Sequence, residues 1–160
     1  MPHRHAAVSL AVAGLAATAV VAPSAQASDA GLKKTVVRYE SRLTPVADEF
    51  AKADQGLATA PDTNAASAAT GRFRTSLRAY KTAIVPIKTR SATSAAAKKQ
   101  LLTAIREYDL GLVQYQKLLD QVNAGTDKTT LKSTFTTLNK RIKAAADDEA
   151  GALKKLGLAK

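Results

Sequence analysis

The stretch LLTAIREYDLGLVQYQKLLDQV, residues 101–122, decides the fold of this chain, because its apolar residues recur at alternating spacings of four and three. On a helix this heptad spacing gathers the apolar side chains on one face, which is typical of helices that pack side by side. The positions concerned are Leu101, Ile105, Tyr108, Leu112, Tyr115, Leu119 and Val122. We therefore expect one long helix here, with this face buried against other helices.

Three further segments repeat the heptad spacing. They carry Leu32, Val36, Tyr39, Leu43, Val46, Phe50, Ala53 and Leu57; Ala66, Phe73, Leu77, Tyr80, Ile84 and Ile87; and Leu131, Phe135, Leu138, Ile142 and Ala145. In the last segment a strict register would place Glu149 in the core. A change of register through Ala146, Ala150 and Leu153 to Leu156 avoids the cost of burying a carboxylate, and we expect that change.

Turn and cap residues divide the chain into four helices, over about 30–57, 63–87, 94–123 and 127–156. Asp62 is a candidate N-cap, and Asn123-Ala124-Gly125 is a typical helix end. We expect Pro45 to kink the first helix without ending it, and Pro86 to kink or end the second. Because short connections favour antiparallel neighbours, the pattern predicts an all-α, up-down-up-down four-helix bundle with heptad-like seams. The oligomeric state stays open, since heptad helices can complete a core within or between chains.

Residues 1–27 have the pattern of a cleavable signal peptide. A short basic start is followed by a small-apolar run from Ala6 to Ala22, then by Pro23 and Ala25-Gln26-Ala27. The alternative, an uncleaved anchor, is disfavoured because the run is short and rich in alanine. We therefore predict a secreted or extracytoplasmic protein with no transmembrane span after processing, whose single domain covers residues 28–160.

Removing that segment would also remove both histidines and the one methionine from a chain that has no cysteine or tryptophan. Zinc sites and Ser-His or Cys-His catalysis then lack their usual groups, and no disulfide can form. We expect no catalytic residues, no metal and no cofactor, and therefore a non-enzymatic protein. The acidic residues Asp48, Glu49 and 147–149 are interpreted as solvated helix faces. A Glu149 that stayed on the seam would need a partner, such as Lys98 or a tyrosine hydroxyl.

Charge is the strongest functional signal. Of a formal net charge of +11, nine basic residues and no acidic residue fall between Thr63 and Arg106. A basic surface of this kind either keeps a helix soluble or binds an anionic partner. The binding residues we predict are Arg74, Arg78, Lys81, Lys88, Arg90, Lys98 and Lys99. The expected partner is an anionic polymer of a bacterial cell envelope or an acidic protein surface, and not sequence-specific nucleic acid, because no nucleic-acid-binding motif occurs.

The tyrosines suggest an alternative function. Tyr39, Tyr80, Tyr108 and Tyr115 all fall on the predicted seams, and we expect the first three to lie at similar heights in the bundle. Seam aromatics usually serve packing. They can also line a core pocket, in which case the protein would carry a small amphiphilic ligand between its helices.

Overall fold

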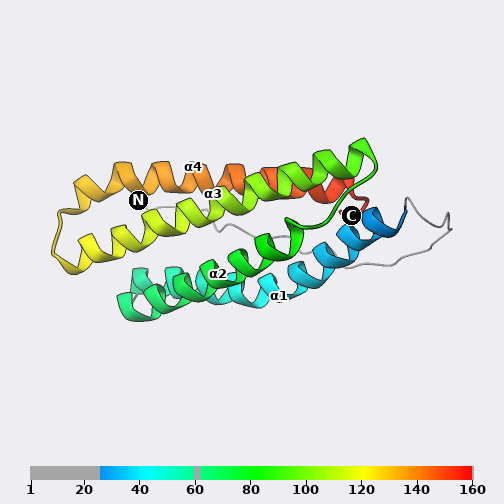
Figure 1. Cartoon of the computed structure of the whole chain (residues 1–160). Coiled ribbons are helices and arrows are strands. Elements are labelled where there is room, and N and C mark those ends of the chain that lie inside the picture. The colour runs from blue at the N-terminus through cyan, green and yellow to red at the C-terminus, as the bar shows by residue number, and fades with distance from the viewer. Residues whose placement is uncertain (1–25, 60–61, 160) are drawn as a thin grey trace.

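The computed structural model describes residues 26–59 and 62–159, with side chains described at 29–56, 62–127 and 131–159 (Figure 1). This part of the chain is all-helical and contains no strand, as predicted. Its helices are α1 (Gln26–Thr59), α2 (Thr63–Ile84), α3 (Ala92–Asn123) and α4 (Lys128–Lys155). The predicted signal peptide lies outside the described residues, except that its last two residues begin α1.

Local hydrogen bonds explain where the helices begin and end. The Asp62 carboxylate accepts from the backbone N–H groups of Asn64 and Ala65, which confirms it as the N-cap of α2. The Ser91 hydroxyl accepts from the Ser94 N–H and caps α3. Gly125, which directly follows the C-cap of α3, has a φ of 76°, a conformation that other residues adopt at a cost.

The two prolines have different effects. Pro45 lies inside α1, which continues through it as one helix, as predicted. The hydroxyl of Thr44, the residue just before it, donates to the Glu40 carbonyl one turn earlier, at 2.9 Å. Pro86 follows the end of α2, which stops at Ile84, three residues before the predicted boundary. At this second site the ring ends the helix, because proline cannot supply an N–H to the preceding turn.

The core contains most of the predicted heptad positions, and all four helices contribute to it. On α3 each of them except Val122 is at most 4% exposed. The main apolar cluster joins Leu32 and Val36 of α1, Leu77 of α2 and Leu101 of α3 to the alanines of α4. A smaller cluster contains Ala66, Tyr115, Leu119 and Leu138. Gly111 of α3 is buried, and a Cβ added there would lie 3.2 Å from the Ile142 side chain of α4.

Two predicted core positions are wrong. Val122, in the last turn of α3, is 41% exposed, and Phe135, in the second turn of α4, is 38% exposed. Within the described residues, no Cα atom of α4 lies within 8 Å of one in α1 or α2. The backbone of α4 therefore closely approaches that of α3 alone, which leaves Phe135 without a second neighbouring helix to cover it.

The predicted change of register in α4 is also wrong. Ala145, Ala152 and Leu156 are buried, whereas Ala150 is exposed, so the strict heptad continues and Glu149 lies on the seam, partly buried. The strict register is tolerated because the Glu149 carboxyl group has hydrogen-bonding partners inside the bundle.

Side-chain bonds also join parts of the chain that are distant in sequence at the ends of the helices. The Thr63 hydroxyl at the start of α2 donates to Asn123 at the end of α3, at 2.8 Å. The Asp29 carboxylate of α1 accepts from the backbone N–H groups of Arg90 and Ser91, between α2 and α3. These bonds, that from Arg90 first, hold the pKa of Asp29 below its usual value.

Leu138 tests the packing between α3 and α4, because it is 1% exposed and belongs to the smaller cluster. Replacing it with alanine (Leu138→Ala) should lower the free energy of unfolding by about 2–5 kcal/mol, through lost burial and a residual cavity. Urea denaturation followed by circular dichroism measures this. Phe135→Ala, one turn earlier at a position that is 38% exposed, is the control and should cost clearly less than Leu138→Ala. Equal losses would contradict this packing.

Candidate functional site

Three of the basic side chains on α2 form ion pairs with other helices. Arg72 bonds Glu49 of α1 through two of its nitrogens. Arg74 donates to Asp109 of α3 at 2.8 Å, and Arg78 lies 3.9 Å from the same carboxylate. The first two predicted binding residues, Arg74 and Arg78, therefore share one acidic partner inside the protein.

Lys98 has a structural role. Its ammonium group donates to the carbonyls of Val85 and Ile87, both at 2.7 Å, and so closes the C-terminal end of α2. The carbonyls at the end of a helix lack partners within it and attract a cation.

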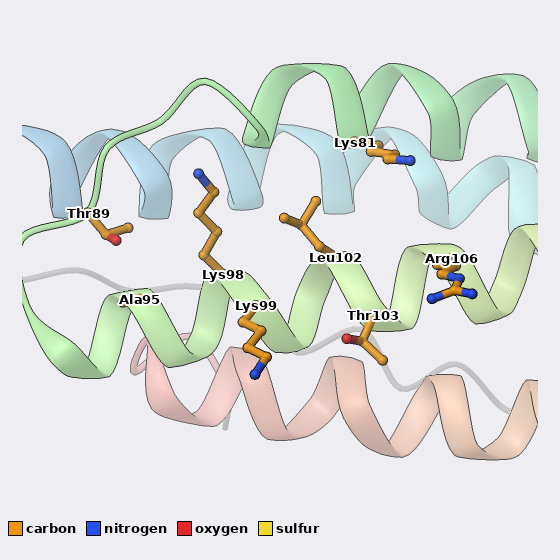
Figure 2. Close-up of a pocket in the computed structure, with 8 residues that line it drawn as sticks. All are labelled: Lys81, Thr89, Ala95, Lys98, Lys99, Leu102, Thr103 and Arg106. Atoms are coloured by element: carbon orange, nitrogen blue, oxygen red, sulfur yellow. The ribbon is translucent and has the colours of Figure 1, made fainter.

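A surface groove of about 450 Å³ brings the other cations together (Figure 2). Its walls come from α2, the connection after it and the first half of α3, and it is lined by Lys81, Thr89, Ala95, Lys98, Lys99, Leu102, Thr103 and Arg106. Figure 2 shows Lys98 reaching toward the α2–α3 connection, in keeping with its bonds to the carbonyls there. No acidic residue lines this basic groove.

Lys81, Lys99 and Arg106 form no ion pair within the described residues, so these three residues line the groove without an internal counterion. Lys88 and Arg90 are exposed on the connection, outside the lining of the groove. The predicted site residues are thus divided between the groove, the connection and the pair with Asp109. Sequence reasoning missed Arg106 as a site residue. The signal available was its spacing, because Lys99, Thr103 and Arg106 follow one another at four and three residues along one face.

A second site, inside the bundle, contains the tyrosines. Tyr80 is fully buried and stacks on Tyr39, with ring centroids 5.2 Å apart and planes 2° apart. The Tyr80 hydroxyl donates to Glu40 of α1, and the Tyr108 hydroxyl donates to Glu149 of α4, each at 3.0 Å. Burial, and then the neighbouring carboxylate, raises the pKa of each of these two hydroxyls far above its usual value, so both stay protonated.

The two carboxyl groups also meet. Glu40 and Glu149 share a side-chain hydrogen bond, and such a bond requires one of them to carry a proton. Burial, and then the charge of Glu40, raises the pKa of Glu149 to about 8. Burial also raises the pKa of Glu40. The tyrosine partner expected for a Glu149 on the seam is therefore present, whereas the second carboxyl group was not foreseen.

Tyr115 forms a similar bond further along α3. It is 2% exposed, packs edge-on against Phe50 at 5.1 Å, and donates to Asp54 of α1 at 2.6 Å. Burial, and then the bond to Asp54, raises the pKa of this hydroxyl. Three of the four tyrosine hydroxyls thus donate to carboxylates of the chain itself. A second groove, of about 360 Å³, is lined by Gln114, Lys117, Gln121, Ser133, Thr134 and Thr137 of α3 and α4, so neither groove is lined by a tyrosine.

Within the described residues, no cluster of three or more His, Cys, Asp or Glu side chains could hold a metal ion. No described helix combines the length and apolar character that crossing a membrane requires. Comparison with protein-family models, with curated proteins and with solved structures finds no match for this chain.

The bond between Tyr115 and Asp54 can be tested by removing one oxygen atom. Tyr115→Phe should lower the free energy of unfolding by about 1–2 kcal/mol, because a buried hydrogen bond to a charged group is lost. Tyr39→Phe is the control, since the Tyr39 hydroxyl has no hydrogen-bond partner among the described residues. Chemical denaturation of both variants should show a change only in the first, and an unchanged Tyr115→Phe would contradict the stabilising role of this bond.

Proposed function

We propose that this chain is an exported, non-catalytic, antiparallel up-down-up-down bundle that binds an anionic polymer of the cell envelope in the basic groove. In this proposal residues 1–27 are removed during export and residues 28–160 form the one binding domain. The groove supplies the site, and the export pattern of the N-terminal segment supplies the compartment in which envelope polymers are available.

One observation carries the proposal: cations from two helices line one groove that has no acidic residue. The acid-free run from Thr63 to Arg106 includes α2, the connection and the first half of α3, which together form the walls of the groove. A solubilising function would not require the cations to line a common groove. Lys81, Lys99 and Arg106 lack internal partners, so an external anion can bind them without first displacing an acidic side chain.

The shape of the groove favours a polymer. The groove is open to solvent along the surface of α3, and two hydroxyl groups, from Thr89 and Thr103, stand among the cations. An extended chain of phosphate or carboxylate groups can meet several cations in succession, and its affinity then comes from ion pairing and the release of counterions. An acidic protein surface offers the same charges, and the binding experiment below separates the two.

The alternative function, an amphiphile carrier with a tyrosine-lined core, lacks an observation in its favour. Three of the four hydroxyls that would hold the ligand are hydrogen-bonded to Glu40, Glu149 and Asp54.

The proposal predicts a specific loss of binding. Neutralising the groove in the triple variant Lys81→Gln, Lys99→Gln and Arg106→Gln should weaken binding to inorganic polyphosphate at least tenfold at low salt. It should also flatten the dependence of log Kd on log salt concentration, because fewer ion pairs form. Fluorescence anisotropy with a labelled polyphosphate chain gives both quantities.

The matched control removes three positive charges elsewhere, with Lys33→Gln, Lys132→Gln and Lys140→Gln on exposed positions of α1 and α4. It should retain affinity to within about threefold. Equal losses in the two triple variants would leave only a general effect of net charge and would overturn the groove as the site. Binding to an acidic protein domain, with none to polyphosphate or polyglutamate, would exclude the polymer.

A further inference from the structure

A continuous hydrogen-bonded chain crosses the bundle and uses one side chain from each helix. Tyr80 of α2 donates to Glu40 of α1, Glu40 shares a hydrogen bond with Glu149 of α4, and Tyr108 of α3 donates to Glu149. Each tyrosine hydroxyl has a single proton and uses it in the bond to its carboxyl group. The bond between the two carboxyl groups therefore needs an additional proton, which only the carboxyl groups themselves can carry.

No basic side chain forms an ion pair with this cluster within the described residues. On α1, Arg38 and Arg42 lie over the ring of Tyr39, 5.9 and 5.7 Å from its centroid. On α4 the nearby charge is that of Asp147, which is also negative and forms an ion pair with Lys143. From α2 and α3 the groups that face the pair are the neutral tyrosines. A second negative charge on the pair would thus meet no neutralising cation.

The position of the pair gives this proton a mechanical consequence. Within the described residues no Cα atom of α1 lies within 8 Å of one in α4, so these two helices meet through side chains. We propose that Glu40 and Glu149 form a proton-dependent latch, in which one shared proton holds α1 to α4 and its loss loosens that side of the bundle. The latch is independent of the basic groove, which lies on the α2–α3 side.

The sign of the pH effect follows from the raised pKa. Glu149 titrates near 8 in the folded protein and near 4.5 when its surroundings are removed. Between these values the folded state holds more protons on Glu149 than the unfolded state does, so the stability that this group contributes is fully present below about pH 4.5 and is lost as the pH rises toward 8. Once the shared proton is lost both carboxyl groups are charged, and their repulsion acts directly between α1 and α4.

Distance measurements in the full chain test the latch. The chain has no cysteine, so the pair Ser41→Cys and Ala150→Cys places two unique spin labels at exposed positions next to Glu40 and Glu149. Double electron–electron resonance should show a longer and broader distribution of distances between the two labels above pH 8 than at pH 6. The variant Glu149→Gln keeps a neutral donor and acceptor of similar shape, and in that background the distribution should not change with pH.

Two controls make the result specific. A label pair on the other side of the bundle, Ala79→Cys on α2 and Ala96→Cys on α3, should give the same distances at both pH values. Carbon NMR of the Glu149 carboxyl group in the unmodified chain gives its titration midpoint without any substitution, should Glu149→Gln fail to fold. A midpoint near 4.5, or a distance between α1 and α4 that is constant from pH 6 to pH 9, would overturn the latch.

Discussion

The hydrogen bond between the carboxyl groups of Glu40 and Glu149 is the interaction on which the centre of the bundle depends. Burying one carboxylate is costly, and burying two charged ones side by side is prohibitive without a cation. The protein avoids both costs with one retained proton and two tyrosine donors. The same arrangement explains why the heptad register of α4 continues through Glu149, because the position is polar and its hydrogen bonds are satisfied.

Most of the fold could be predicted from the sequence because its determinants are local. The helix caps Asp62 and Ser91, the helix end at Gly125 and the heptad positions act within a few residues of one another. Predictions failed where the determinant was a distant neighbour. Phe135 has the correct spacing for the core and is exposed, because no helix besides α3 closely approaches α4. Whether a heptad position is covered depends on the packing of other helices, which its own segment does not encode.

For the candidate site, too, the local features could be predicted from the sequence and the contacts between distant residues could not. Counting charges located the basic region, yet it could not show that Asp109 would reach Arg74 or that Lys98 would bind the end of α2. These contacts join residues that are distant in sequence, on two different helices or on the two sides of a connection. Glu40 was missed for a related reason. It lies beside the predicted seam and becomes important only because α4 brings Glu149 to it.

The interior carboxyl groups and the basic groove are connected, because the acidic residues that bind groups inside the protein are not available to neutralise the groove. Asp54, Glu40 and Glu149 accept bonds from tyrosines, Glu49 and Asp109 bind arginines of α2, and Glu107 lies 3.5 Å from Arg141. Asp29 and Asp62 bind backbone N–H groups at helix ends. With these acidic side chains engaged elsewhere, Lys81, Lys99 and Arg106 are left without counterions in the described structure. The proposed attraction for an external anion therefore rests on how the fold uses its own carboxylates, as well as on the excess of basic residues.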